Sequence, residues 1–157
     1  MPSLVGSEMC IRDRSKAAVQ AIMDADVVTI GPGSWFSSVI PHILVPDIAQ
    51  ALNETSATVV VILNLSPEAG ETHGFTTERH IHVFSQHAPQ LDVDYFLADE
   101  NTATSEGERD NIARAASRLD AKVVFAPMRE IDAKGAPLNR HDPMQLAAAL
   151  KSLRPAR

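Results

Sequence analysis

The organisation of this chain is clearest in one segment near its start, Ala25-Asp-Val-Val-Thr-Ile-Gly-Pro-Gly-Ser-Trp-Phe-Ser-Ser38. Its β-branched run is typical of a buried strand, and the glycines behind it let the backbone approach a ligand because no Cβ intervenes. Serine hydroxyls and unpaired N–H groups at the start of the next helix favour an anion. The segment therefore predicts a phosphate or nucleotide site at the carboxyl end of a parallel strand, formed by Gly31, Gly33, Ser34, Ser37 and Ser38.

The spacing of these glycines matches neither G-x-G-x-x-G nor the lysine-bearing P-loop. An ordinary strand–turn–helix junction, with glycines that serve tight packing, is therefore the alternative to a ligand site. Ser34 is not predicted to be a nucleophile, because the G-x-S-x-G elbow is missing.

Outward from this segment, strands and helices alternate along the chain. Continuous apolar runs predict three further strands, at residues 58–63, 94–98 and 122–125. Helical spacing and capping residues predict helices at about 15–25, 46–53, 76–87, 105–119 and 142–153. Pro41 and Pro46 exclude one continuous helix between the first two strands. The pattern predicts an α/β fold with a doubly wound, mostly parallel, Rossmann-like sheet and helices on both faces.

A second polar loop, Asn64-Leu-Ser-Pro-Glu-Ala-Gly-Glu-Thr72, follows the second predicted strand. The Asn64 amide can donate and accept hydrogen bonds, and a Glu71 carboxylate can accept from sugar hydroxyls. Thr72 and Gly74 offer close backbone contact. Because the carboxyl ends of parallel strands meet at one edge, these four residues are expected to form the opposite wall of the site. A solvated surface loop with a helix cap is the alternative.

The composition excludes several classes of protein. The 157 residues are 45% hydrophobic and 22% charged, as in one ordinary globular domain. A net charge of −6 argues against a nucleic-acid-binding surface, and no apolar stretch is long enough to span a membrane. Cys10 is the single cysteine, so no intrachain disulfide is expected and a cytoplasmic location is favoured. The six histidines lack the spacing of a metal site, so no metal ligand and no catalytic residue are assigned.

The first fourteen residues lack the periodicity of the chain that follows and resemble translated sequencing-adapter DNA. They are expected to be non-native or disordered, which leaves residues 15–157 as the folded unit.

The two loops together resemble the YvcK family, the gluconeogenesis factors of the CofD-like superfamily. The resemblance rests on Ile30-Gly-Pro-Gly-Ser-Trp-Phe-Ser-Ser-Val-Ile-Pro41, Leu44-Val-Pro46, Asn64, Gly70-Glu-Thr-His-Gly-Phe75, and Arg140-His-Asp142. Trp35-Phe36 and Arg79-His-Ile-His82 are similar to the actinobacterial branch. The family's opening strand and glycine-rich turn are missing, so the resemblance implies the C-terminal part of a CofD-like domain, with an incomplete sheet.

The resemblance implies a cytoplasmic regulatory protein that binds a nucleotide sugar, UDP-N-acetylglucosamine, and is linked to gluconeogenic growth, cell shape and peptidoglycan synthesis. Regulatory protein partners and a homo-oligomeric full-length protein are further expectations. The alternative is a CofD-type enzyme, which transfers a phospholactyl group in the synthesis of a deazaflavin coenzyme. A scaffold whose loops merely pack is a third reading. His73 and Asp47 depart from the family pattern, so neither is given a role.

Overall fold

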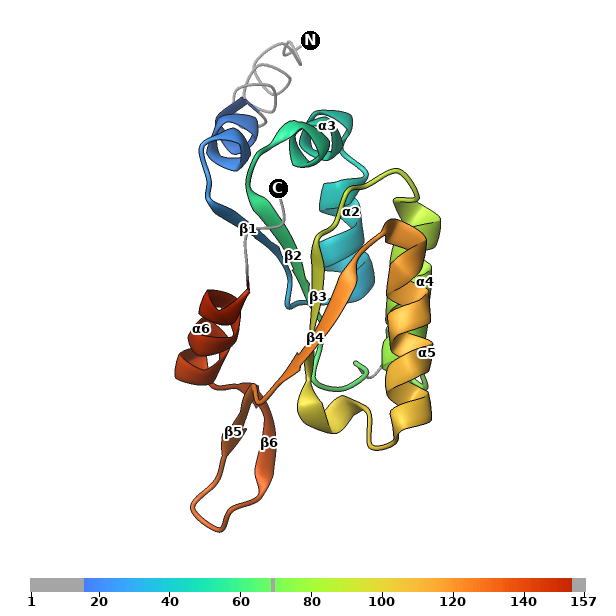
Figure 1. Ribbon diagram of the computed structural model, residues 1–157, viewed down its shortest axis with the longest axis vertical. Helices are drawn as coiled ribbons and strands as arrows, with labels where there is room; N and C mark the ends of the chain where they lie inside the picture. The colour runs from blue at the N-terminus through green and yellow to red at the C-terminus, as the bar shows by residue number, and fades with distance from the viewer. Residues whose placement is uncertain (1–15, 69, 154–157) are drawn as a thin grey trace, which may run out of the picture.

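The computed structural model describes residues 16–68 and 70–153 (Figure 1). The expectation that residues 1–14 lie outside the folded unit concerns residues that are not described, so it stays a prediction. Within the described ranges, no helix has both the length and the apolar character needed to cross a membrane.

A parallel four-stranded sheet forms the centre of the molecule. The strands lie in their chain order, β1-β2-β3-β4, with bounds β1 Val27–Ile30, β2 Thr58–Ile62, β3 Tyr95–Asp99 and β4 Lys122–Ala126. Every residue of β2 and β3 is buried, as their continuous apolar runs predict for central strands. The predicted mostly parallel sheet is therefore confirmed, and its carboxyl ends all lie at one edge.

The helices begin at the predicted capping residues. Residues 16–23 are helical, and the other helical segments are η1 Trp35–Val39 (a π-helix), α2 Ile40–Ile43, α3 Pro46–Glu54, α4 Thr77–His87, η2 Glu100–Thr102, α5 Glu106–Ala116, η3 Ser117–Leu119 and α6 Pro143–Ser152. Thr76 caps α4 and Asp142 caps α6, while Ser105 and Glu108 form a complete capping box at α5. A new helix starts at Pro46, as the two prolines require.

Helices cover both faces of the sheet, but unequally (Figure 1). Parallel strands in chain order, joined by right-handed crossovers, place their connecting helices on one face, and α2 to α5 lie there. Phe84 of α4 packs on this face against Phe96 of β3, with ring centroids 5.8 Å apart. On the opposite face lies α6, where Ala149 is buried with Val60 of β2 and Leu97 of β3.

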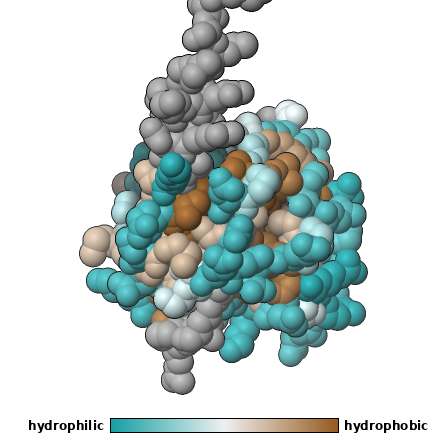
Figure 2. All heavy atoms as spheres, turned by 90° about the horizontal axis from the view of Figure 1, so that it is seen from above, coloured by the Kyte–Doolittle hydropathy of each residue, from teal (hydrophilic) through white to brown (hydrophobic). Residues whose placement is uncertain are grey.

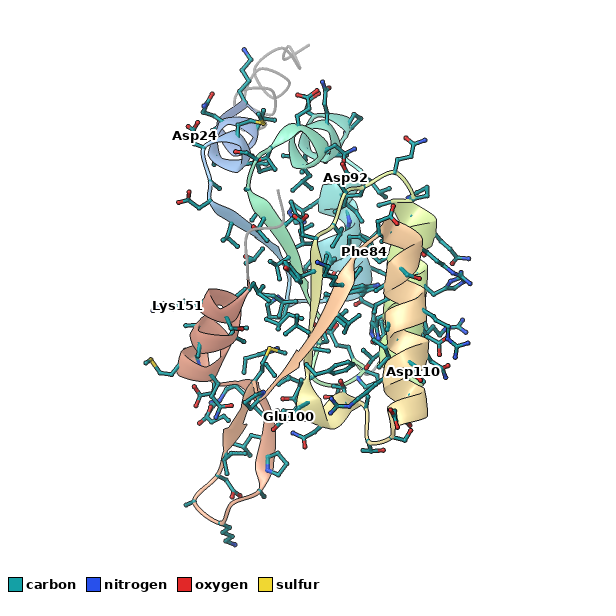
Figure 3. All side chains as sticks on the ribbon, viewed as in Figure 1. Asp24, Phe84, Asp92, Glu100, Asp110 and Lys151 are labelled. Carbon is teal, nitrogen blue, oxygen red and sulfur yellow. The ribbon has the colours of Figure 1, made fainter. Side chains whose placement is uncertain are left out.

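Most of the interior is apolar and most charged side chains point outward, with buried Asp99 as an exception. Figure 3 shows Phe84 between the sheet and its helices, whereas Asp110 and Lys151 project from the outer sides of α5 and α6. Viewed from the end that carries α3, hydrophobic atoms are visible between surrounding hydrophilic ones (Figure 2).

A small antiparallel hairpin, which was not predicted from the sequence, follows β4. Its strands are β5 Arg129–Ile131 and β6 Pro137–His141, and Asp132 Oδ1 closes the turn by accepting from the N–H groups of Lys134 and Ala136, both at 2.8 Å. Neither strand has a clear alternation of apolar and polar residues, and no residue of either strand is fully buried. The hairpin returns Asn139 and His141 to the carboxyl edge of the main sheet.

Candidate functional site

The glycine turn after β1 has a conformation that only glycine accepts readily at its first position. Gly31 has a φ of +78°, and a Cβ added there would lie 2.9 Å from the carbonyl oxygen of Ile62 in β2. The close approach of the two backbones therefore explains Gly31. At Gly33, an added Cβ would only reach ordinary contact with the Ser38 side chain, at 3.4 Å.

Asn64 joins the two predicted loops. Its Oδ1 accepts from the Gly33 N–H at 3.1 Å, and its Nδ2 donates to the Gly33 carbonyl at 2.9 Å. The side chain thus binds both backbone groups of one residue in the glycine turn. The sequence-based expectation that Gly33 and Asn64 lie together agrees with this geometry, although the amide is engaged by the chain itself.

Ser34 contacts Glu71 of the second loop. The Ser34 hydroxyl lies 2.6 Å from each carboxylate oxygen of Glu71 and also contacts the Ser37 hydroxyl. The pKa of Glu71 lies below its usual value because Ser34 donates to the carboxylate, and the Phe36 N–H group reinforces this effect against the opposing influence of burial. The start of the helical segment after β1 therefore holds an anion, and that anion is the chain's own carboxylate.

The remaining predicted site residues have structural contacts. Thr72 is fully buried, and its hydroxyl accepts from the Glu68 N–H at 2.8 Å. The Ser38 carbonyl contacts Nδ1 of His42, and Gly74 has a φ of +76° in the turn before α4. Thr72 and Ser38 thus shape the loops, whereas Ser34, Asn64 and Glu71 bring the two loops together.

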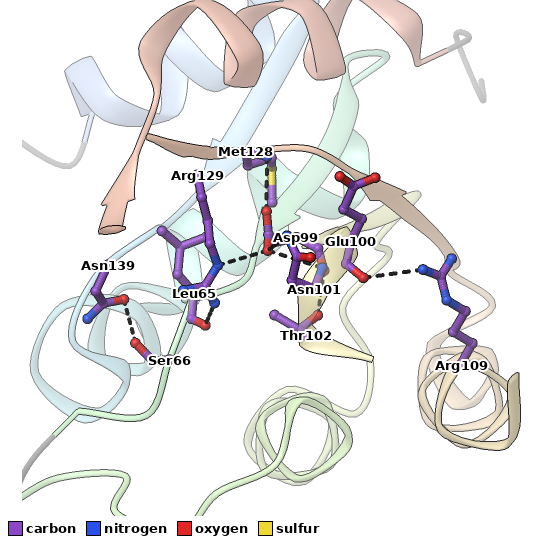
Figure 4. A network of polar contacts seen from close by, with 10 residues as sticks. All are labelled: Leu65, Ser66, Asp99, Glu100, Asn101, Thr102, Arg109, Met128, Arg129 and Asn139. Carbon is purple, nitrogen blue, oxygen red and sulfur yellow. Dashed lines mark hydrogen bonds and ion pairs between the residues drawn. The ribbon is translucent and has the colours of Figure 1, made fainter. Parts of the chain in front are cut away.

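A buried ion pair that was not predicted from the sequence joins the end of β3 to the start of β5 (Figure 4). Asp99 is 1% exposed and accepts from Arg129 Nε at 2.9 Å, from the Met128 N–H at 3.0 Å, and from two nitrogens of Asn101 at 3.2 Å. Burial raises the pKa of Asp99, but the hydrogen bonds from Arg129, Met128 and Asn101 outweigh it, so the net pKa is lowered. Arg129 also donates to the Leu65 carbonyl, which ties the segment after β2 to the pair.

Two hollows flank the segment that follows β2. The larger is a cavity of about 400 Å³ between the start of α4, α5 and the ion pair, lined among others by Phe75, His80, Asn101, Asn111 and Arg129. The smaller, about 250 Å³, lies between the glycine turn and the β6 strand. Residues 64–66 line both, so the two hollows share a wall at the carboxyl edge of the sheet.

Each hollow contains a histidine with an unpartnered nitrogen. Nδ1 of His80 lies 2.9 Å from the Thr76 carbonyl, whereas its buried Nε2 has no hydrogen-bond partner in the described chain. His141 in the smaller hollow also has a buried Nε2 without such a partner. Burial is the main cause that lowers the pKa of both imidazoles, so both are neutral near pH 7 and their Nε2 atoms can accept a hydrogen bond.

Among the described residues, no group of three or more His, Cys, Asp or Glu side chains converges as a metal site would require. The features missed from the sequence are long-range ones. Asp99 at a strand end was the available signal for the ion pair, but nothing in the sequence pairs it with Arg129.

The chain belongs to the CofD family. The family model described as "2-phospho-L-lactate transferase CofD" matches residues 5–136, which is most of the sequence. The family resemblance derived from the two loops is therefore confirmed.

Curated relatives carry the name "Putative gluconeogenesis factor". One from Mycobacterium tuberculosis is 51% identical over 136 residues, which cover 87% of this chain and 38% of the relative. One from Mycobacterium leprae is 44% identical, with coverage of 89% and 38%. A crystal structure of a UPF0052 family member from Bacillus halodurans has a TM-score of 0.69 and 25% identity, and the match covers 87% of this chain and 46% of that one. The chain thus spans less than half the length of these proteins.

Proposed function

We propose that this chain forms part of a nucleotide-sugar-binding regulatory protein, with UDP-N-acetylglucosamine as its ligand. In this proposal the protein acts in the cytoplasm and links growth on gluconeogenic carbon to cell shape and peptidoglycan synthesis. The name of the mycobacterial relatives, gluconeogenesis factor, supports the regulatory context. Regulatory protein partners and homo-oligomerisation of the longer protein belong to the same proposal.

One observation carries the proposal: the glycine turn and the second loop are joined at the carboxyl edge of a parallel sheet, where an anion is already held. The Asn64–Gly33 hydrogen bonds fix the backbone of the turn, and the Ser34 hydroxyl donates to the Glu71 carboxylate. In open α/β sheets, ligands bind at this edge. A phosphate group matches the same donors as a carboxylate, so ligand binding would exchange Glu71 for a phosphate at Ser34.

Calorimetric titration of the purified chain with UDP-N-acetylglucosamine tests this function. Ser34→Asp places a second carboxylate where the phosphate would bind, and like charges about 4 Å apart cost on the order of a few kcal/mol at a dielectric near 20. The affinity should therefore fall at least about tenfold, since each factor of ten is about 1.4 kcal/mol. Circular dichroism on the same sample monitors the fold.

Ser56→Asp is the matched control. Ser56 is exposed and precedes β2 at the amino end of the sheet, so the same change in charge is made away from the proposed site. Its affinity should stay within about twofold of the wild type. Equal affinities of wild type and Ser34→Asp, in a folded variant, would exclude a phosphate role for this loop.

A CofD-type transferase is the second candidate, and the observation behind it is the description of the matched family. Such an enzyme would act by positioning its substrates and stabilising the charge on a leaving nucleotide phosphate. Product formation from a deazaflavin acceptor and a phospholactyl nucleotide would support this candidate, and binding without turnover would support the regulatory protein.

A further inference from the structure

We propose that the cavity between α4 and α5 binds the sugar ring of the ligand, while the diphosphate lies at the glycine turn. This inference rests on the proposed function and assigns separate positions to two parts of the ligand. It makes Asn111, Asn101 and His80 the residues that determine which sugar is accepted.

The arrangement of the two hollows suits a ligand with two parts. The cavity of about 400 Å³ is near the lower end of the range for small-molecule sites, which fits a single ring rather than a whole dinucleotide. The segment 64–66 separates it from the smaller hollow, which is lined by Pro32 and Gly33 of the glycine turn. A ligand that crosses this segment would place one part in each hollow.

The polar groups that remain available in the cavity are both donors and acceptors. Asn111 accepts from Arg114 through Oδ1, which leaves its NH₂ group without a partner in the described chain. Asn101 uses its NH₂ group on Asp99, which leaves its Oδ1 available. His80 lines the cavity as well, and its buried Nε2 has a lone pair without a partner in the described chain. Hydroxyl groups both donate and accept, so a polyhydroxylated ring matches this mixture.

The charges around the cavity favour a neutral ligand part. Glu78 and Glu108 line it, and the positive charge of Arg129 is compensated by buried Asp99. An additional phosphate here would therefore meet two carboxylates, and among the described residues that line the cavity Arg129 is the one Lys or Arg. The cavity is thus less suited to the diphosphate than to an uncharged sugar.

The aromatic surface of the cavity offers limited stacking for a nucleobase. Phe75 lines the cavity, but the Arg79 guanidinium lies over its ring, 4.8 Å from the centroid. The His80 ring meets Phe75 at 67°, with centroids 5.4 Å apart. Nucleobase sites depend on accessible aromatic ring faces more than sugar sites do. In this cavity the apolar side chains of Leu65 and Ile112 suffice to pack against the C–H groups of a sugar.

Two ligands and one substitution test the assignment. Asn111→Leu removes the available NH₂ group from a half-buried position in α5 and keeps a good helix former. The effect of this substitution on affinity should differ between UDP-N-acetylglucosamine and UDP, which lacks the sugar. We expect the variant to bind the nucleotide sugar at least about fivefold more weakly than the wild type, a loss of about 1 kcal/mol in binding free energy. Its affinity for UDP should stay within about twofold of the wild type.

Gln86→Leu makes a similar amide-to-leucine change on the exposed side of α4, outside the cavity, and should leave both affinities unchanged. Equal losses for both ligands in Asn111→Leu would overturn the assignment, because the cavity would then hold the base or the phosphates. Unchanged binding of both ligands would overturn it as well.

A second measurement separates this inference from the proposed function. Free N-acetylglucosamine, titrated at millimolar concentration, should shift the imidazole NMR signals of His80 in the wild type, and not those of exposed His87. A His80 shift without any binding of UDP or the nucleotide sugar would refute the proposed function and keep the sugar cavity. Nucleotide-sugar binding that leaves the His80 signals unchanged would refute the sugar cavity and keep the proposed function.

Discussion

Replacing Asp99 by alanine should be among the most destabilising single changes in this chain. The carboxylate is 1% exposed and accepts hydrogen bonds from a guanidinium nitrogen and two backbone N–H groups, those of Met128 and Asn101. Its removal leaves the Arg129 side chain, which is 16% exposed, with an uncompensated charge. Breaking such a buried pair from one side costs about 3–5 kcal/mol, and the backbone donors left without a partner add to this value.

Urea denaturation followed by far-UV circular dichroism measures this loss as a lower free energy of unfolding. Arg140→Ala is the matched control, because it breaks the Arg140–Glu130 pair, whose side chains are 68% and 34% exposed. An exposed pair contributes at most about 1 kcal/mol. A loss for Asp99→Ala no greater than that for Arg140→Ala would refute the reasoning that burial makes this ion pair important.

Three further changes test individual features. Burial lowers the pKa of His80 below 6.5, so just below that pH the unfolded state binds more protons than the folded state. The melting temperature should therefore fall as the pH drops from 7 to 5. The fall should be smaller in His80→Phe, where His141, whose pKa is also lowered, accounts for what remains. Gly31→Ala should lower the free energy of unfolding, measured in urea, by about 2 kcal/mol or more, because a Cβ would clash with the Ile62 carbonyl. In the control Gly135→Ala, where φ is similar but the space is open, the loss should be about 1 kcal/mol. Glu71→Gln keeps an oxygen acceptor for Ser34 but removes the charge that competes with a phosphate. The affinity for UDP, measured by calorimetry, should therefore rise several-fold. A weaker affinity would instead indicate that the carboxylate binds the ligand directly.

The parts of the fold that depend on local sequence could be predicted. The β-branched run of β2 specifies a strand buried on both sides, and the caps at Ser105 and Asp142 fix the starts of α5 and α6 because they act within four residues. The family resemblance came from the two loops, which are specific motifs. These features require no knowledge of which distant segments meet.

The rest of the site depends on contacts between distant residues. Asp99 and Arg129 are 30 residues apart. They meet because β3 pairs with β4, which ends just before Arg129 begins β5. Periodicity carries no information about that adjacency, and for an Arg in a polar segment the sequence predicts an exposed position. The hairpin that returns His141 to the site was missed for a related reason, since its short strands have little apolar surface to produce a pattern.

The Ser34–Glu71 contact gives the proposed ligand exchange a physical basis. A helix start with unpaired N–H groups is stabilised by negative charge, and here a carboxylate from the neighbouring loop supplies it. Glu68 lies next to Glu71, and the pKa of Glu68 is raised by burial and by its hydrogen bond to the Glu71 carboxylate. A phosphate that replaced Glu71 would release that carboxylate from Ser34 and remove the hydrogen-bonded carboxyl pair. The second loop would then lose its contact with Ser34 while Asn64 still held the glycine turn, so ligand binding would change the loop without disturbing the sheet. A regulatory protein needs such a separation, because its ligand must alter a surface that a partner can recognise while the fold itself stays intact.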